Sequence, residues 1–394
     1  MTTLSREQDL VTALERHLPA FVALRHHLHG FPETAYEEVR TANIVAEELA
    51  SAGLEVHRLA GTGVVGVLRG PGTRAVALRA DLDALNVTEE TGLPYASRVP
   101  GKMHACGHDG HTTALLLAAR VLAEAGDLPG TMVFVFQPAE EGGAGAKALL
   151  DAGLLDRFPV EAVYGLHNIP GLHAEQFAVL DGPVMASADG FEVVLRGVGG
   201  HAALPHEARD PVVAAGALIG TLQTLVSRSL SPLSPGVVSV TQLSAGEALN
   251  VIPDEVKVRG TVRAYTEEVR DLLEAGLRRV SAGVAQAHGV EARVTYTRSY
   301  PATVNDPREA AFVRGVLQGA FGEAGVRADL PPLMAAEDFA FLLRERPGAY
   351  VWIGNGNSAP LHSPRYDFND GVLPRAATFW VHLARAALTR GETP

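Results

Sequence analysis

The sequence has one cysteine, no cluster of basic residues and no long apolar run, and each absence excludes a class of protein. A single cysteine among 394 residues permits no disulfide within the chain, which fits a reducing compartment and leaves the thiol free for a metal. The formal net charge of -12, with no run of Lys and Arg, argues against nucleic acid as a partner. The longest apolar stretches, such as 212–219, are too short to span a bilayer, and no signal-peptide core stands at the N-terminus. We therefore expect a cytoplasmic protein with no membrane partner.

The overall composition is that of an ordinary globular protein. Hydrophobic residues make up 47% and charged residues 20% of the chain, which is enough to build a full core. A length of 394 residues predicts about two or three domains.

The first half of the chain alternates between helical and strand patterns. Apolar residues recur at helical spacing over 5–29 and 36–52, and a further helix is expected from the segment after residue 104 to about residue 125. Short strands are expected at 64–68, 75–79, 131–137 and 162–166. The run 131–137 is apolar at every position but its two ends, as expected of a parallel strand that is buried on both faces.

The pattern changes between residues 185 and 299. The order strand, helix, strand, strand, helix, strand predicts a ferredoxin-like α+β (βαββαβ) domain inserted in the first one. We therefore expect an α/β catalytic domain with a mostly parallel sheet, formed by residues 1–184 and 300–394, and an inserted lid or dimerisation domain at 185–299.

The segment from His104 to His111 is the most distinctive stretch. It holds the only cysteine, Cys106, and His108 follows two residues later across a glycine. A bent loop can aim this thiolate and imidazole at one point, as metal ligands require. The alternative is that Cys106 is a small buried hydrophobic residue and His108 a satisfied polar group.

Other candidate ligands follow predicted strands. In an open α/β sheet, ligands bind outside the carboxyl ends of the strands, so these residues are expected to meet. The candidates are Asp81 or Asp83, Glu140 or Glu141, His167 and His362.

This donor set indicates a transition metal. Thiolate, imidazole and carboxylate together suit Zn, Mn, Co or Ni better than Ca or Mg. Five or so ligands are too many for one tetrahedral ion with an open position, so a pair of ions about 3.5–4 Å apart fits better. Side chains of adjacent residues in extended backbone point apart, so one of Glu140 and Glu141 could bind metal while the other takes a proton from water.

Six strings together resemble the N-acyl-amino-acid amidohydrolases. This is the group of hippurate hydrolases and indoleacetyl-amino-acid hydrolases, within the dimetal aminoacylase and carboxypeptidase superfamily. The strings are LRADLDAL (78–85), MHACGHDGH (103–111), QPAEEG (137–142), GLHN (165–168), GGHAA (199–203) and ALNVIP (248–253).

The resemblance implies a role for each matching residue. The implied metal ligands are Cys106, His108, Glu141, His167 and His362. Glu140 would be the general base and Asp83 a supporting aspartate. In the inserted domain, His201 would stabilise the oxyanion, often across a dimer interface, although its Gly-Gly-His string could also be a plain surface turn. Asn250 would contact the substrate, and Arg263 is a further candidate for binding its carboxylate because of its planar guanidinium.

The expected activity is cleavage of the amide of an N-acyl-L-amino acid, such as a hippurate-like or N-acetyl substrate, by a homodimer or homotetramer with two divalent metal ions. The alternative within the superfamily is a dipeptidase or an N-acetyl-diaminopimelate deacetylase. Outside it, the chain could be a metal-binding or regulatory protein with a degraded site, but no ligand is missing. Cys106 could also be a redox thiol, against which the lack of a resolving cysteine counts.

Overall fold

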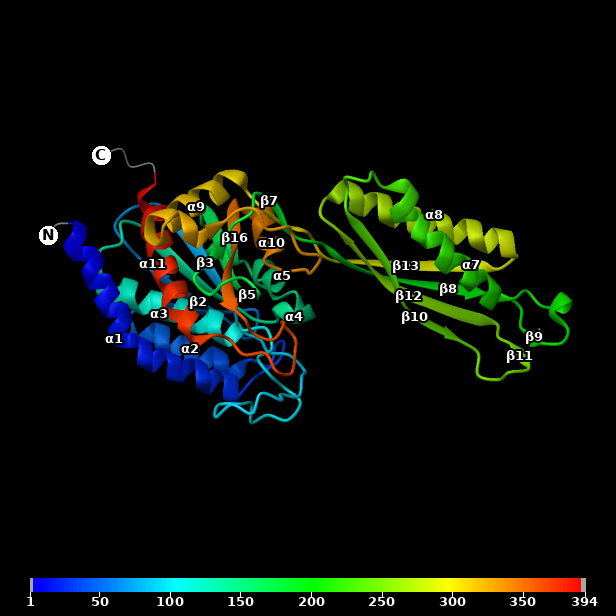
Figure 1. The fold of residues 1–394 in the computed structure, drawn as a ribbon, viewed down its shortest axis with the longest axis horizontal. Coiled ribbons are helices and arrows are strands. Elements are labelled where there is room, and N and C mark those ends of the chain that lie inside the picture. The colour runs from blue at the N-terminus through cyan, green and yellow to red at the C-terminus, as the bar shows by residue number, and fades with distance from the viewer. Residues whose placement is uncertain (1–2, 391–394) are drawn as a thin grey trace. The chain divides into compact units, whose positions relative to one another are not determined.

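The computed structural model describes residues 3–390, which divide into two compact units (Figure 1). Unit 1 comprises Met1–Gly182, Val304–Pro331 and Phe341–Pro394. Unit 2 comprises Pro183–Thr303 and the short segment Pro332–Ala340, which lies outside the range expected for the inserted domain. Each unit is built around its own hydrophobic core.

Unit 1 is built on an eight-stranded sheet with the order β1-β2-β4-β3-β5-β16-β6-β15. Its central pairs, β4 with β3, β3 with β5 and β5 with β16, are parallel, whereas β1, β2 and β6 pair antiparallel with their neighbours β2, β4 and β16. The strands are β1 (Glu55–Leu59), β2 (Gly63–Leu68), β3 (Ala75–Asp81), β4 (Thr131–Gln137), β5 (Ala162–Pro170), β6 (Phe177–Ala178), β15 (Val326–Arg327) and β16 (Gly348–Gly356). The α/β class with a mostly parallel sheet is therefore confirmed.

Five long helices pack in unit 1, and α3 is the most deeply buried of them. The first two turns of α3 are buried all round, and it contacts α1, α2 and α11, as Figure 1 shows. Its apolar residues, 114–119, 121 and 122, supply side chains that bury one face of the sheet. The helices are α1 (Thr3–Gly30), α2 (Val39–Ser51), α3 (His108–Ala125), α9 (Pro307–Phe321) and α11 (Leu373–Thr389).

The remaining short elements lie in unit 1, apart from three that cross the boundary with unit 2 along the chain. Those within unit 1 are α4 (Glu140–Gly143), α5 (Gly145–Asp151), α6 (Leu154–Arg157), η3 (Glu323–Gly325) and η4 (Asp370–Val372). Those that cross the boundary are β7 (Gly182–Met185), β14 (Thr303–Asn305) and α10 (Ala340–Glu345).

Two expected elements differ from the structure, and one strand was not expected. The second helix begins at Val39 and not at residue 36, because Tyr36 has a left-handed backbone with φ 62°. Strand β1 was not predicted, since its sequence EVHRL has little apolar content. Strand β5 continues to Pro170, so that His167 lies within the strand and not after it.

Unit 2 has the expected ferredoxin-like order. Its sheet runs β10-β12-β8-β13 with all pairs antiparallel, and Figure 1 shows α7 and α8 side by side on one face of it. The long elements are β8 (Ala188–Arg196), α7 (Pro211–Thr224), β10 (Gly236–Ala245), β12 (Glu255–Ala264), α8 (Glu267–His288) and β13 (Glu291–Tyr300). The short ones are β9 (Gly200–His201), η1 (Pro205–Glu207), η2 (Leu225–Ser229) and β11 (Val251–Ile252).

One helix of unit 2 exceeds the expected apolar stretch. Together α7 and η2 form a 19-residue helix, Pro211–Ser229, with a mean hydropathy of 1.2, long and apolar enough by length and composition alone to cross a membrane. Its buried residues recur at helical spacing and face the core of unit 2; they are Pro211, Ala214, Ala215, Leu218, Leu222 and Leu225. The helix is thus buried along one face, with 28% of its most apolar window buried, whereas Val212 and Val213 are exposed.

Candidate metal centre

The sheet of unit 1 brings three predicted site segments to one edge. Asp81 is the last residue of β3, Glu140 follows β4, and His167 lies near the end of β5. These strands are neighbours in the order β4-β3-β5 and run parallel, so their carboxyl ends share an edge.

Cys106, His108 and Glu141 converge at this edge. One potential ligand atom of each lies within 4.8 Å of those of the other two. The turn between Cys106 and His108 depends on Gly107, whose φ is 90°. A Cβ at this position would lie 2.4 Å from Asn168 Nδ2, so only glycine permits this approach.

The two remaining predicted ligands adjoin this group. Cys106 Sγ lies 3.4 Å from His167 Nε2, and His362 Nε2 lies 3.1 Å from Glu141 Oε1. His362 is held by its backbone N–H, which donates to Ala105 O at 2.8 Å. The structure thus brings all five predicted ligands together, while ligation itself stays a prediction.

Asp83 supports the segment that carries both glutamates. Its Oδ1 accepts from Glu140 N at 3.0 Å and its Oδ2 from Glu141 N at 2.9 Å. Its Oδ1 also lies 3.3 Å from His108 Nδ1. The expected extended backbone is wrong here, because Glu140–Gly143 form a kinked helical turn in which Glu141 has φ −71° and ψ 72°.

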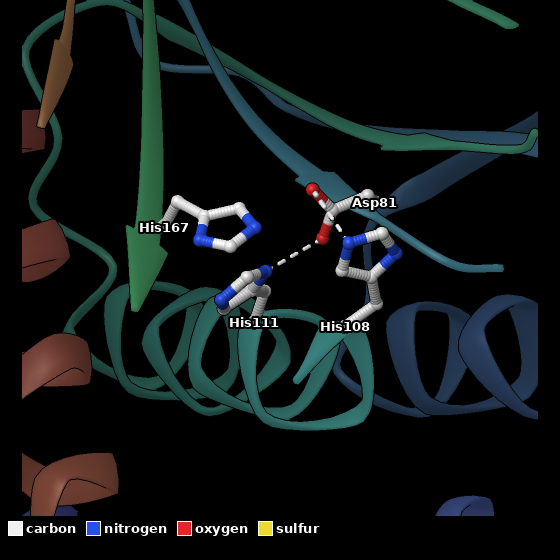
Figure 2. A group of neighbouring side chains, drawn as sticks. All are labelled: Asp81, His108, His111 and His167. Carbon is white, nitrogen blue, oxygen red and sulfur yellow. Dashed lines mark hydrogen bonds and ion pairs between the residues drawn. The ribbon is translucent and has the colours of Figure 1, made fainter. Parts of the chain in front are cut away.

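Figure 2 shows a second group, in which His108, His111 and His167 surround Asp81. His108 and His111 project from α3 one turn apart, while Asp81 comes from β3 and His167 from β5. Sequence reasoning did not assign a role to His111, although its spacing of three from His108 places both on one face of a helix.

His111 has both ring nitrogens engaged. Its Nδ1 lies 2.7 Å from Asp81 Oδ1, and its Nε2 accepts from the backbone N–H of Asn168 at 3.0 Å. Acceptance at Nε2 means that Nδ1 carries the proton and donates to Asp81. His111 is therefore better suited to orient Asp81 than to bind a metal ion.

Asp81 is a buried carboxylate with three basic neighbours. Burial favours its neutral form, but His108, His111 and Arg79 hold the pKa of Asp81 well below its usual range. Arg79 contributes directly, because its Nη1 donates to Asp81 Oδ2 at 2.8 Å. The edge of the sheet thus retains a fixed negative charge.

The site residues fit divalent metal ions. Within residues 3–390, neither ring nitrogen of the buried His108 makes a well-formed hydrogen bond; Nδ1 lies 3.3 Å from Asp83 Oδ1 and Nε2 3.8 Å from Asp81 Oδ2, so either nitrogen could bind a metal. His167 Nδ1 lies 2.6 Å from Asn168 O, to which it can donate, so the lone pair of Nε2, which lies 3.4 Å from Cys106 Sγ, could bind a metal. Burial and the carboxylates of Glu141, Glu140 and Asp81 raise the pKa of the Cys106 thiol, so a cation is needed to stabilise the thiolate.

Three predicted residues belong to unit 2 and not to this group. His201 lies in β9, which pairs with β11, and Asn250 O accepts from Ala202 N at 3.0 Å, so His201 and Asn250 are close to each other. Both are exposed. Arg263 lies on β12, where its Nη1 donates to Thr261 Oγ1 at 2.6 Å. Their roles toward a substrate stay predictions.

Comparison with known proteins identifies relatives of nearly the whole chain. Residues 77–386 match the family described as peptidase family M20/M25/M40. The chain is 42% identical to the hippurate hydrolase of Campylobacter jejuni, over 90% of this chain and 92% of that protein. It is 38% identical to the N-acetylcysteine deacetylase of Bacillus subtilis, over 90% of this chain and 93% of the relative. The crystal structure of the Bacillus subtilis YXEP protein, described as a dinuclear metal-binding peptidase, superposes with a TM-score of 0.85 at 33% identity, covering 95% of this chain and 99% of that one.

Proposed function

Because this chain belongs to peptidase family M20/M25/M40 and is a metallohydrolase, we propose that it cleaves the amide bond of N-acyl-L-amino acids to a carboxylic acid and an amino acid. The observation that carries the proposal is the convergence of Cys106, His108 and Glu141 beside the buried Glu140 at one edge of the sheet. Relatives named for hippurate and N-acetylcysteine support the acyl amino acid as substrate class.

The proposed cofactor is a pair of divalent ions drawn from Mn, Zn, Co and Ni. The residues that would hold them are Cys106, His108, Glu141, His167 and His362. When bound, such ions supply Lewis-acid chemistry, polarising a carbonyl and lowering the pKa of water. A thiolate, three imidazoles and a carboxylate are the donors that this class of metal prefers.

The protein's own residues then divide the remaining work. Glu140 would take a proton from water and deliver it to the leaving nitrogen, for which its place beside the ligands suits it. Asp83 would keep Glu140 in place by accepting a hydrogen bond from the backbone N–H of Glu140. From unit 2, which we propose serves as lid and dimerisation domain, His201 would stabilise the oxyanion, and Asn250 and Arg263 would bind the substrate.

A substrate panel with a matched variant tests the proposal. Hippurate, N-acetyl-amino acids, indoleacetyl-amino acids, dipeptides and N-acetyl-diaminopimelate are incubated with the protein, with and without Mn, Zn, Co or Ni. Glu140→Gln should abolish amino acid release while metal content is retained, and Glu47→Gln, at an exposed position of α2, should match the wild type. Preferential cleavage of dipeptides or of N-acetyl-diaminopimelate would favour the alternative substrates. Full activity of Glu140→Gln would refute the assigned base.

The assembly and location complete the proposal. We expect a homodimer or homotetramer in the cytoplasm, without nucleic acid or membrane as partner. A fully active monomer in analytical ultracentrifugation would contradict a role of His201 across an interface.

A further inference from the structure

Strained backbone gathers around the two glutamates of the site. Five non-glycine residues within residues 3–390 have positive φ: Tyr36, Ala60, Ala139, Ala144 and His362. Ala139 and Ala144, each with φ 54°, flank the turn that holds Glu140 and Glu141, and His362 contacts Glu141. Residues in such conformations persist only where surrounding contacts hold them, and they cluster at functional sites.

Two buried carboxylates hold three successive backbone N–H groups of this turn. Glu38 Oε1 accepts from Ala139 N at 2.9 Å, and Asp83 accepts from the next two residues. The strained residue is thus fixed from one side by Glu38 and the glutamates from the other by Asp83. Asp83 was expected from the sequence to be a supporting residue, whereas Glu38 was not.

The Glu38 carboxylate binds Ala139 N and does not cap its own helix. Glu38 stands at the N-terminus of α2 but makes no capping hydrogen bond to that helix with its side chain. Its exposed fraction is 0%, and its second oxygen accepts from Thr62 Oγ1 at 2.6 Å. A buried carboxylate is costly unless it is hydrogen-bonded, and the Thr62 hydroxyl and the backbone N–H of Ala139 satisfy one oxygen of Glu38 each, so Glu38 couples the start of α2 to residue 139.

Tyr36 is hydrogen-bonded to Gly143, at the C-terminal end of the same turn. Its own φ is 62°, and its hydroxyl donates to Gly143 O at 2.7 Å. Gly143 is closely packed, since a Cβ there would lie 2.6 Å from the Cβ of Ala139 and 3.2 Å from the ring of Tyr36. Residues 36–38, which join α1 to α2, therefore contact both ends of the segment 139–143.

We infer that Glu38 is a positioning residue for Glu140: it holds Ala139 in the left-handed conformation that directs the general base, and Tyr36 secures the end of the turn. The inference rests on the proposed function of Glu140. We call the hydrogen bond from Ala139 N to the Glu38 carboxylate the brace. A displacement of a reacting group by about 1 Å can cost about 100-fold in rate, so loss of the brace should lower kcat. Metal binding and KM should change little, because Glu141, the proposed ligand on this turn, remains held by Asp83, and the other proposed ligands lie on other segments.

Four variants test the brace by kcat, KM, metal content and thermal midpoint. Glu38→Ala should lower kcat about 10- to 100-fold. Glu38→Gln keeps a carbonyl oxygen for Ala139 N and should recover most of the rate. Ala139→Gly in the Glu38→Ala background should also recover it, because glycine adopts positive φ without strain. Glu33→Gln is the matched control: that carboxylate accepts hydrogen bonds from Arg40 N and Thr41 N in α2, not from the turn 139–143, and its loss should leave kcat unchanged.

The outcomes separate this inference from the proposed function. If the wild-type protein cleaves no substrate on the panel, the proposed function fails. If it is active and Glu38→Ala keeps the wild-type kcat, the brace is refuted. If Glu38→Ala loses activity and neither the glutamine nor the added Ala139→Gly restores it, Glu38 acts only in folding and the inference is also refuted.

Discussion

Replacing Asp83 by asparagine isolates what one buried carboxylate does for the site. Asp83 is 1% exposed, and its two oxygens each accept one backbone N–H. Asparagine has the same shape but one oxygen, so its amide nitrogen must face the N–H of either Glu140 or Glu141. One buried donor is then unpaired, which costs about 1–3 kcal/mol.

The loss should be visible in both stability and metal affinity. A cost of 1 kcal/mol lowers the thermal midpoint by about 2–4 °C in a domain of 150–250 residues. With a cost of about 1–3 kcal/mol, Asp83→Asn should lower the thermal midpoint by about 2–12 °C. Because Asp83 also lies 3.3 Å from His108 Nδ1, metal affinity should fall about 10- to 100-fold. Differential scanning calorimetry of the metal-free protein and a Co titration measure the two effects.

A surface aspartate provides the control. Asp156→Asn changes an exposed carboxylate of α6 and should alter neither quantity. If Asp83→Asn keeps both the thermal midpoint and the metal affinity of the wild type, Asp83 does not support the glutamates in the way described.

Three further predictions follow from other contacts. His111→Asn should keep the number of bound metal ions but weaken each about 10- to 100-fold, because His111 orients Asp81; loss of one ion per chain in a Co titration would instead make His111 a ligand. Gly107→Ala should give a protein that binds no metal in the same titration, since its Cβ would meet Asn168 Nδ2 at 2.4 Å; wild-type binding would show that the loop tolerates a shift. Burial opposes charge on His29, but its hydrogen bond to Asp109 raises the pKa of His29 to about 9, above its unfolded value of 6.5. The resulting stability is complete below about pH 6.5 and is lost as pH rises through about 9, so the thermal midpoint of the wild type, measured from pH 6 to 10, should approach that of His29→Gln at high pH. A constant difference between the two across this range would contradict the assignment.

Much of the fold and the convergence of the candidate ligands could be predicted because they leave patterns in the sequence. The apolar run of β4 and the helical spacing of α8 follow from burial, and ligand-type residues such as Glu140 and His167 stand near strand ends, where parallel strands meet.

The parts that could not be predicted depend on contacts between distant segments. Glu38 bonds a backbone N–H 101 positions away, and a hydrogen bond to backbone needs no particular residue type at its other end. The turn after β4 begins at Ala139, whose positive φ is not indicated by its residue type. Tyr36 likewise has a helix-compatible sequence but a left-handed backbone that delays α2 to Val39.

The most direct test of the whole account is the metal content per chain of the protein purified with Cys106 kept reduced, compared with Cys106→Ala, by inductively coupled plasma mass spectrometry. We expect two transition-metal ions per chain in the wild type and a loss of metal in Cys106→Ala. A wild-type protein that binds no Mn, Zn, Co or Ni even when these are supplied would contradict it.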